Sequence, residues 1–333
     1  MASIRFTLCA TALVVAACGA DNAPTAPVLD RSPDNSGAVQ AESHRHLFEL
    51  RGSPGVNAAK PQGGGGGSGI FYHGGPVLGS GTNVAAVYWA AGTIYTGGPN
   101  PGTHGSGASD GSLVGYFLSH LGGSPYFNIN STYTDGNGQH IANVVNYTQY
   151  WANNTSAPSG TQIVSDAQMI AMLQSGFTSG ALTYDPGTLY AIFTAGQVNL
   201  GGGFGGTNFQ YCAYHTHGTV TINGVSRTVL YAAMPYDAAY PSSCTDNVAP
   251  NGDFGADAEV NTLAHEVEET TTDMMGNAWF DRRGYENADK CAWNFGTTFP
   301  SGGSQANITV GAKNFMVQQN WVNAGNGGCL QQY

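Results

Sequence analysis

The fold is decided by two apolar runs, Val87-Tyr88-Trp89 and Tyr190-Ala191-Ile192-Phe193. Both are short and rich in β-branched and aromatic residues, as expected of strands that are buried in a sheet. The surrounding pattern predicts strands at residues 83–89, 141–147, 189–194, 209–215, 227–234 and 308–310, and helices at residues 111–121, 165–175 and 257–273. Because strands and helices alternate from residue 83 to residue 194, we predict an α/β fold with one mixed β-sheet flanked by helices.

The N-terminal residues predict export. Residues 1–17 carry a single charge, Arg5, followed by an apolar run that is too short to span a bilayer, as in a lipoprotein signal peptide. The run ends in Val15-Ala16-Ala17-Cys18, which resembles a bacterial lipobox whose cysteine carries the lipid. The alternative is ordinary signal-peptidase cleavage near Ala20. We expect an exported protein, in the cell envelope or outside the cell, that touches a membrane only through a lipid on Cys18.

Residues 18–68 differ in composition from the rest of the chain. They contain five prolines and the run Gly63–Gly67, and they show no apolar periodicity. This composition is typical of a flexible linker, in which we expect His44 and His46 to be inert. Residues 69–333 then form a single globular domain without internal repeats.

The composition limits the classes of function. Charged residues make up only 9% of the 333 residues, and 10 Lys and Arg stand against 21 Asp and Glu, for a net charge of -11. A nucleic-acid-binding protein needs a basic surface to neutralise phosphates, so nucleic acid is excluded as a partner.

The cysteines agree with export. Outside the signal region four remain, an even number that suits disulfides in an oxidising compartment. Three pairings are open, and proximity in the sequence favours Cys212–Cys244 and Cys291–Cys329.

The acidic residues of the domain are concentrated in one window. Ten of its 16 Asp and Glu residues lie between Asp253 and Asp289, and all five of its glutamates are among them. Like charges at this density repel one another unless a cation is present, so this window is where we expect a site.

The window contains the motif Leu263-Ala264-His265-Glu266-Val267-Glu268-Glu269. On a helix, Glu269 lies about 40° and Glu266 about 100° around the axis from His265. His265 and Glu269 therefore project one turn apart from one face, as two ligands of a metal ion do, and Glu266 beside them is placed to act as the general base. Asp273 continues the same stripe and is predicted to support the site. The predicted element is thus a zincin-like active-site helix; the alternative is a solvated helix face.

A third ligand is needed, and two residues downstream are candidates. Glu286 follows Glu269 by 17 residues, which leaves room for a turn and a return segment. We take Glu286 as the ligand and Asp289 as the partner that orients His265 through its other ring nitrogen, or the two in exchanged roles. Zinc is the expected ion because a histidine is present, and calcium is the alternative because carboxylates dominate.

His215 and His217 alternate on a predicted strand and share one face. They offer either another imidazole to the site or a hydrogen-bonded strand pair beside a disulfide, and we favour the second interpretation.

Several segments resemble the EXORDIUM / phosphate-induced protein 1 family of secreted proteins. They are Tyr72-His73-Gly74-Gly75-Pro76-Val77-Leu78, Ala249-Pro250-Asn251-Gly252-Asp253 and Cys291-Ala292-Trp293. The resemblance implies export and the family fold. Plant members are apoplastic proteins linked to growth with no established catalysis, and they lack the His-Glu pair. Bacterial relatives carry a metallopeptidase-like His-Glu-x-x-Glu motif followed by Thr-Asp, a Trp and Glu-x-x-Asp before a Cys, as residues 265–291 do here.

Two functions are therefore expected. The first is a secreted or lipid-anchored zinc metallohydrolase, most simply a peptidase acting on peptide or protein substrates, with zinc on His265, Glu269 and Glu286 and with Glu266 as the base. The second is a non-catalytic cell-envelope protein that associates with polysaccharide and contains a structural metal.

Overall fold

The computed structural model describes residues 46–53, 69–201 and 211–333, all within one compact unit, residues 36–333. The predicted signal peptide at residues 1–17, the lipid site at Cys18 and most of the linker at residues 18–68 lie outside the described residues. Among the residues that are described, no helix is long and apolar enough to cross a membrane.

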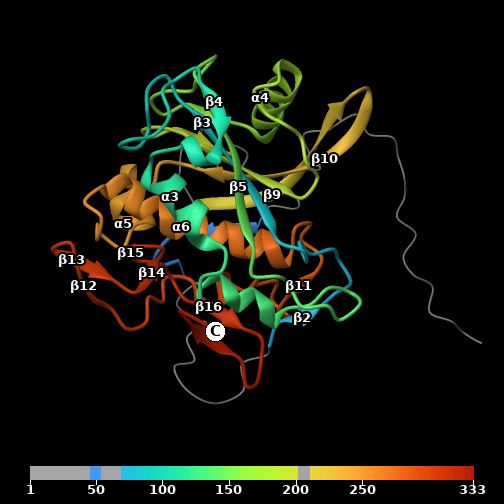
Figure 1. Ribbon diagram of the computed structural model, residues 1–333, viewed down its shortest axis with the longest axis vertical. Helices are drawn as coiled ribbons and strands as arrows, with labels where there is room; N and C mark the ends of the chain where they lie inside the picture. The colour runs from blue at the N-terminus through green and yellow to red at the C-terminus, as the bar shows by residue number, and fades with distance from the viewer. Residues whose placement is uncertain (1–45, 54–68, 202–210) are drawn as a thin grey trace, which may run out of the picture. The chain divides into compact units, whose positions relative to one another are not determined.

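Strands and short helices alternate along the chain (Figure 1). The strands are β1 His46–Glu49, β2 Phe71–Tyr72, β3 Thr82–Trp89, β4 His104–Ser106, β5 Val145–Asn153, β6 Ile163–Val164, β7 Thr188–Phe193, β8 Asn199–Leu200, β9 Tyr211–Ile222, β10 Val225–Met234, β11 Trp279–Phe280, β12 Phe299–Ser301, β13 Ser304–Ala306, β14 Ile308–Val310, β15 Lys313–Phe315, β16 Asn320–Val322 and β17 Gly328–Leu330. The helices are α3 Leu113–Leu121, α4 Asp166–Ser179, α5 Pro241–Cys244 and α6 Phe254–Thr272, with 3-10 turns η1 Gly107–Ser109, η2 Phe127–Thr132, η3 Asp237–Ala239 and η4 Asp289–Cys291.

A seven-stranded mixed sheet organises these elements, in the order β1-β9-β10-β7-β3-β5-β4. The four central strands β10, β7, β3 and β5 are parallel, and β9, β1 and β4 are antiparallel to their neighbours. The two apolar runs lie side by side at its centre, where Val87 pairs with Ile192 and Tyr88 with Phe193. The predicted mixed sheet flanked by helices is confirmed.

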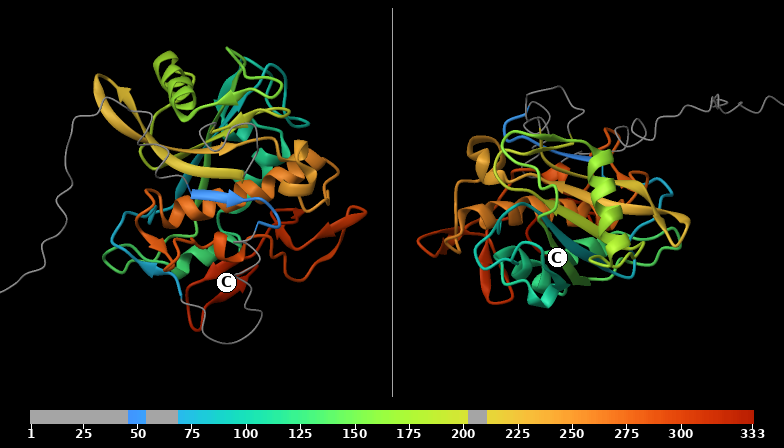
Figure 2. Two further views of the ribbon diagram at one scale, coloured as in Figure 1. Left: turned by 180° about the vertical axis from the view of Figure 1, so that it is seen from behind. Right: turned by 90° about the horizontal axis from the view of Figure 1, so that it is seen from above.

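Both faces of the sheet are covered because successive side chains of a strand point to opposite faces. On β3, Val84, Ala86 and Tyr88 pack into the core that contains α3 and α6. Ala85, Val87 and Trp89 pack on the other face, in the core that contains α4. Figure 2 shows the sheet between α4 and α6. The acidic helix α6 is therefore an interior layer against the sheet.

Three strands differ from the sequence expectation. β9 runs on to Ile222, whereas residues 209–215 are predicted, of which 209 and 210 lie outside the described residues. β5 begins at Val145 and runs to Asn153, whereas residues 141–147 are predicted. Asn143 is tied into a turn, because its side chain accepts from Gly123 N and donates to Ser124 O, so the strand begins after it. β1 lies inside the predicted linker and pairs antiparallel with β9, because the buried Phe48 anchors it.

The two disulfides are the pair that proximity in the sequence favours, Cys212–Cys244 and Cys291–Cys329. Both are consistent with an exported protein. The first fixes β9 three residues before His215, and the second fixes η4 two residues after Asp289. Each disulfide thus fixes a segment, β9 or η4, that carries a side chain located near the acidic residues of α6.

Removal of the second disulfide tests its contribution. The Cys291→Ser/Cys329→Ser double variant should lose about 4 kcal/mol of unfolding free energy, because the bridge closes a loop with a sequence separation of 38. Denaturant titration measures the loss, and amide exchange should increase in η4. An unchanged midpoint under oxidising conditions would contradict a stabilising role.

Candidate metal centre

Helix α6 is a polar helix in the protein interior. Its N-cap Asp253 accepts a hydrogen bond from Ala256 N, and every residue from Gly255 to Thr272 is buried. The buried residues include one histidine and five acidic residues, Asp257, Glu259, Glu266, Glu268 and Glu269. A buried carboxylate is costly unless it is protonated, hydrogen-bonded or next to a cation, and the burial excludes a solvated helix face.

His265 faces two carboxylates. Its Nε2 lies 3.0 Å from Glu269 Oε1 and 3.5 Å from Asp289 Oδ1. The helical spacing brings Glu269 to one turn beyond His265, and η4 brings Asp289 from the return segment. The ligand atoms of these three residues all lie within 4.8 Å of one another, so they form one of the groups that can hold a metal ion.

Gln318 determines the orientation of His265. Its Nε2 donates to His265 Nδ1 at 3.0 Å and to Ala288 O at 2.9 Å, so His265 Nδ1 accepts and Nε2 carries the proton of a neutral ring. A metal ion on Nε2 would require the ring proton on Nδ1. To accept that proton through Oε1, the Gln318 amide would have to give up its bond to Ala288 O and the bond that it accepts from Trp293 N. On the ring face, Phe48 of β1 stacks on His265 with the centroids 4.1 Å apart.

His215 of β9 stands between three glutamates. Its Nδ1 lies 3.1 Å from Glu266 Oε2 and 3.6 Å from Glu269 Oε2, and its Nε2 lies 3.8 Å from Glu286 Oε2. The ligand atoms of His215, Glu266 and Glu269 form a second group within 4.8 Å. The imidazole therefore connects the helix to the return segment.

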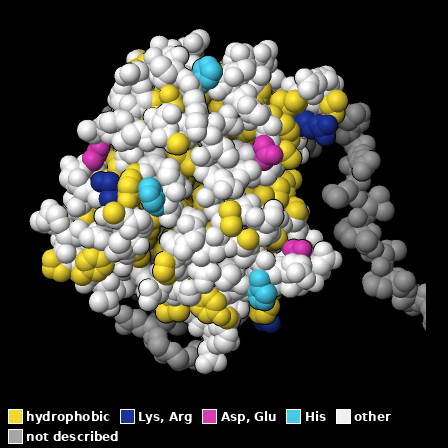
Figure 3. All heavy atoms as spheres, viewed as in Figure 1, with side chains coloured by type: hydrophobic (Ala, Val, Ile, Leu, Met, Phe, Trp, Pro, Cys, Tyr) yellow, Lys and Arg dark blue, Asp and Glu magenta, His cyan; other side chains and the backbone are white. Residues whose placement is uncertain are grey.

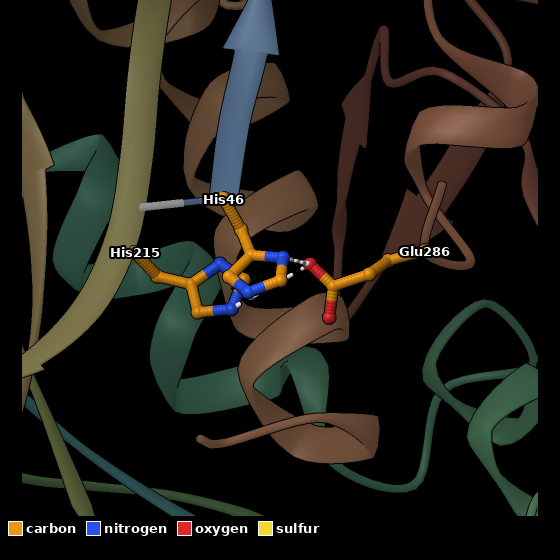
Figure 4. Close-up of side chains that lie close together, drawn as sticks. All are labelled: His46, His215 and Glu286. Atoms are coloured by element: carbon orange, nitrogen blue, oxygen red, sulfur yellow. Dashed lines mark ion pairs between the residues drawn. The ribbon is translucent and has the colours of Figure 1, made fainter. Parts of the chain in front are cut away.

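His46 of β1 completes the cluster. The register of β1 and β9 pairs His46 with His215, and the two rings stack with their centroids 5.0 Å apart. His46 Nδ1 lies 2.6 Å from Glu286 Oε2, so the side chains of both histidines face the same carboxylate oxygen (Figure 4). His46, His215 and Glu286 form a third group.

Several buried polar atoms of the cluster neither donate nor accept a hydrogen bond. Buried atoms of this kind are Nε2 of His215 and His265, Oε1 of Glu266, Oε2 of Glu269 and Oε1 of Glu286. Buried polar atoms are almost always paired in proteins, and exceptions gather where a ligand binds. Solvent reaches the cluster at His46, which is 18% exposed, and at Asp289, which is 13% exposed.

Electrostatics favours protons or a cation in this cluster. Burial raises the pKa of Glu266 and Glu286 well above the usual range, and burial together with Asp289 raises the pKa of Glu269 to about 7. Burial opposes a charge on His265, but Glu269 and Asp289 outweigh it and raise its pKa well above the usual value. Burial, His46 and His265 lower the pKa of His215 well below the usual value. Without a cation, Glu266 and Glu286 keep their protons more readily than exposed glutamates do, and metal ions commonly displace such protons.

The predicted site residues do not all meet at one point. Asp289, and not Glu286, joins His265 and Glu269, while Glu286 lies with His215 and His46. Glu266 lies beside the helix pair against His215. Asp273 ends α6, where its Oδ1 accepts from Asn277 N and Ala278 N and supports the turn into β11.

The sequence did not indicate two participants. His46 stands in a tract of linker composition, and Gln318 is one of several glutamines in an uncharged C-terminal region. The run Leu47-Phe48 next to His46 is the only local signal for a strand, and it is too short to stand out.

Comparison with known proteins places the chain in a family. Residues 122–314, more than half of the chain, match the family model described as the phosphate-induced protein 1 conserved region. The chain belongs to the phosphate-induced protein 1 family. The matched region includes His215, α6, Glu286 and Asp289, whereas His46 lies before it. No match was found among curated proteins, and none among solved structures.

A second buried acidic pair lies near the start of α6, away from the histidines. Asp237 N donates to Glu259 Oε2 at 3.4 Å, and Thr262 Oγ1 donates to Asp237 Oδ2. Burial raises the pKa of Glu259 to about 8, and burial together with Glu259 raises the pKa of Asp237 well above the usual range. This pair is neutralised by protons.

The pair predicts a pH dependence of stability. The folded state keeps the Glu259 proton up to about pH 8, whereas the unfolded chain releases it near 4.5, so stability should fall as pH rises between these values. The Glu259→Gln variant, which mimics the protonated form, should lose part of this slope. Melting temperatures from pH 5 to 9 measure the difference. Parallel curves for the two proteins would show that Glu259 does not titrate in this range.

Proposed function

We propose that the protein is an exported zinc-dependent hydrolase, most simply a peptidase, with its centre on α6. One observation supports it: buried atoms of β9, α6 and Glu286 that neither donate nor accept a hydrogen bond lie in adjoining groups of residues that can hold a metal ion. Perturbed titratable groups that gather in this way mark functional sites. The two disulfides agree with an exported location.

The residues present fit zinc. His265, Glu269 and Asp289 are proposed to hold the ion, a set of one imidazole and two carboxylates that leaves a coordination position open. The imidazole donors favour zinc over calcium, which prefers six to eight oxygen ligands. When bound, zinc supplies Lewis acidity that polarises a carbonyl group and lowers the pKa of water.

Glu266 is the proposed general base. Its Oε2 is held by His215 Nδ1 at 3.1 Å, while its Oε1 is buried and accepts no hydrogen bond. This oxygen is available to accept a proton from the attacking water, and the same carboxyl group then returns the proton to the leaving amine. Burial raises the pKa of Glu266, which suits a group that must both accept and donate a proton near neutral pH.

Other residues of the chain position these groups. Gln318 and Phe48 fix the ring of His265, and Cys291–Cys329 holds η4, which carries Asp289. The partly exposed side of the cluster, at Asp289 and His46, is where a substrate would approach.

A pair of variants tests this assignment. His265→Ala should lose the zinc beside it, because the remaining carboxylates bind zinc less strongly. Glu266→Gln should retain that zinc and reduce kcat on a general protein substrate by roughly 100-fold or more, the contribution typical of general acid–base catalysis. Zinc content and turnover are measured on the same preparations. Full activity in Glu266→Gln would overturn the mechanism.

A second function is favoured by one specific observation, the complete burial of His265 and Glu269. Structural zinc sites are closed, whereas catalytic sites keep an open position. We propose as the alternative a non-catalytic envelope protein with a structural metal, which contacts polysaccharide. The face shown in Figure 3 has few charged side chains among many uncharged ones, as an uncharged partner would suit.

Chelation separates the two functions. Removal of a structural ion should lower the melting temperature by many degrees, because the binding energy of such an ion contributes directly to folding. Removal of a catalytic ion should abolish turnover with a smaller effect on melting. Thermal melts and peptidase assays before and after treatment with a chelator, with zinc added back as the control, give the answer.

A further inference from the structure

The ligand atoms of the cluster form two centres that share a carboxylate. Around His265 lie Glu269 Oε1 and Asp289 Oδ1. Around His215 lie Glu269 Oε2 and, at its other ring nitrogen, Glu286 Oε2. The two oxygens of Glu269 thus face different histidines, so the group around His265 and the group around His215 adjoin each other.

We propose that the cluster holds two divalent cations, the second bound by His46, His215 and Glu286 next to the ion at His265. The ligand atoms of these three residues lie within 4.8 Å of one another. The proposal rests on the proposed function in one respect, because the first of the two ions is the one proposed at His265.

An ion pair alone explains this second group poorly. His46 and His215 both address the same oxygen, Glu286 Oε2, at 2.6 and 3.8 Å. A charged His46 would pair with Glu286 Oε2, but it would leave His215 Nε2 and Glu286 Oε1 without a hydrogen-bond partner. Neutral imidazoles next to a carboxylate are instead a common ligand set for zinc.

Two atoms of the group point to an ion directly. His215 is 1% exposed, and its Nε2 has no hydrogen-bond partner. Glu286 is fully buried, and its Oε1 accepts no hydrogen bond either. Both side chains converge on the space that they share with His46, as Figure 4 shows. A cation there would satisfy the imidazole and the carboxylate together.

The second ion would change what the centre can do. A second ion would add to the Lewis acidity of the centre and so would help to polarise a substrate carbonyl group. The centre would also depend on β1, because His46 reaches it only through the pairing of β1 with β9. The family model matches residues 122–314, so this ligand would come from a segment that lies before the matched region.

Metal counting on the full-length protein tests the proposal. The purified chain is stripped, loaded with zinc, freed of excess ion and analysed for zinc per chain. We expect two ions in the wild type, one in His46→Ala and one in His265→Ala. His217→Ala, on the same strand as His215 but in none of the described metal-binding groups, is the matched control and should keep two. Circular dichroism verifies that each variant is folded.

A spectroscopic measurement covers the case in which a variant fails to fold. The wild type loaded with Mn²⁺ should give an electron paramagnetic resonance spectrum broadened by two nearby ions, because Glu269 of the first group and His215 of the second lie 3.6 Å apart. A spectrum of isolated Mn²⁺ at full loading would overturn the second site without any variant.

The outcomes separate this proposal from the proposed function. One zinc in the wild type that is lost in His265→Ala and retained in His46→Ala overturns the second ion and leaves the hydrolase intact. One zinc that is lost in His46→Ala and retained in His265→Ala overturns the pair and also the first centre. Two ions with full peptidase activity in Glu266→Gln support the pair and refute the mechanism.

Discussion

The rest of the structure depends on one constraint, the burial of an acid-rich helix. Helix α6 packs between the sheet and the C-terminal segments with every residue from Gly255 to Thr272 out of solvent. Apolar residues of the helix, such as Val260, Leu263 and Val267, belong to the core and provide the favourable burial. Its carboxyl groups oppose that burial, so the surrounding elements must neutralise them.

The helix meets this requirement in two ways along its length. Near its start, Glu259 and Asp237 stay neutral because they keep protons, helped by Thr262. One to three turns later, histidines face the carboxyl groups, and unpartnered atoms remain. At the start of the helix, protons alone neutralise the two carboxyl groups. Near the histidines, buried atoms remain that a cation would bind. Both proposals therefore concern this part of the helix.

The segments that complete the cluster are themselves held firmly. The disulfide Cys212–Cys244 secures β9, and Cys291–Cys329 secures η4, so both sides of the cluster are covalently tied. Phe48 anchors β1 by stacking on His265 and on Trp293. A site assembled from distant segments needs such support, because ligand positions must be kept within fractions of an ångström.

The central strands of the sheet, α6, the cysteine pairs and the residues of α6 that face the cluster could be predicted from the sequence. These features are local: they follow from apolar runs, from helical spacing and from charge crowded into one window. Only the tertiary structure decided that Asp289 joins His265, that Glu286 turns to His215, and that His46 takes part. The reason is physical, since the return loop and the pairing of β1 are fixed by long-range packing that no local pattern records.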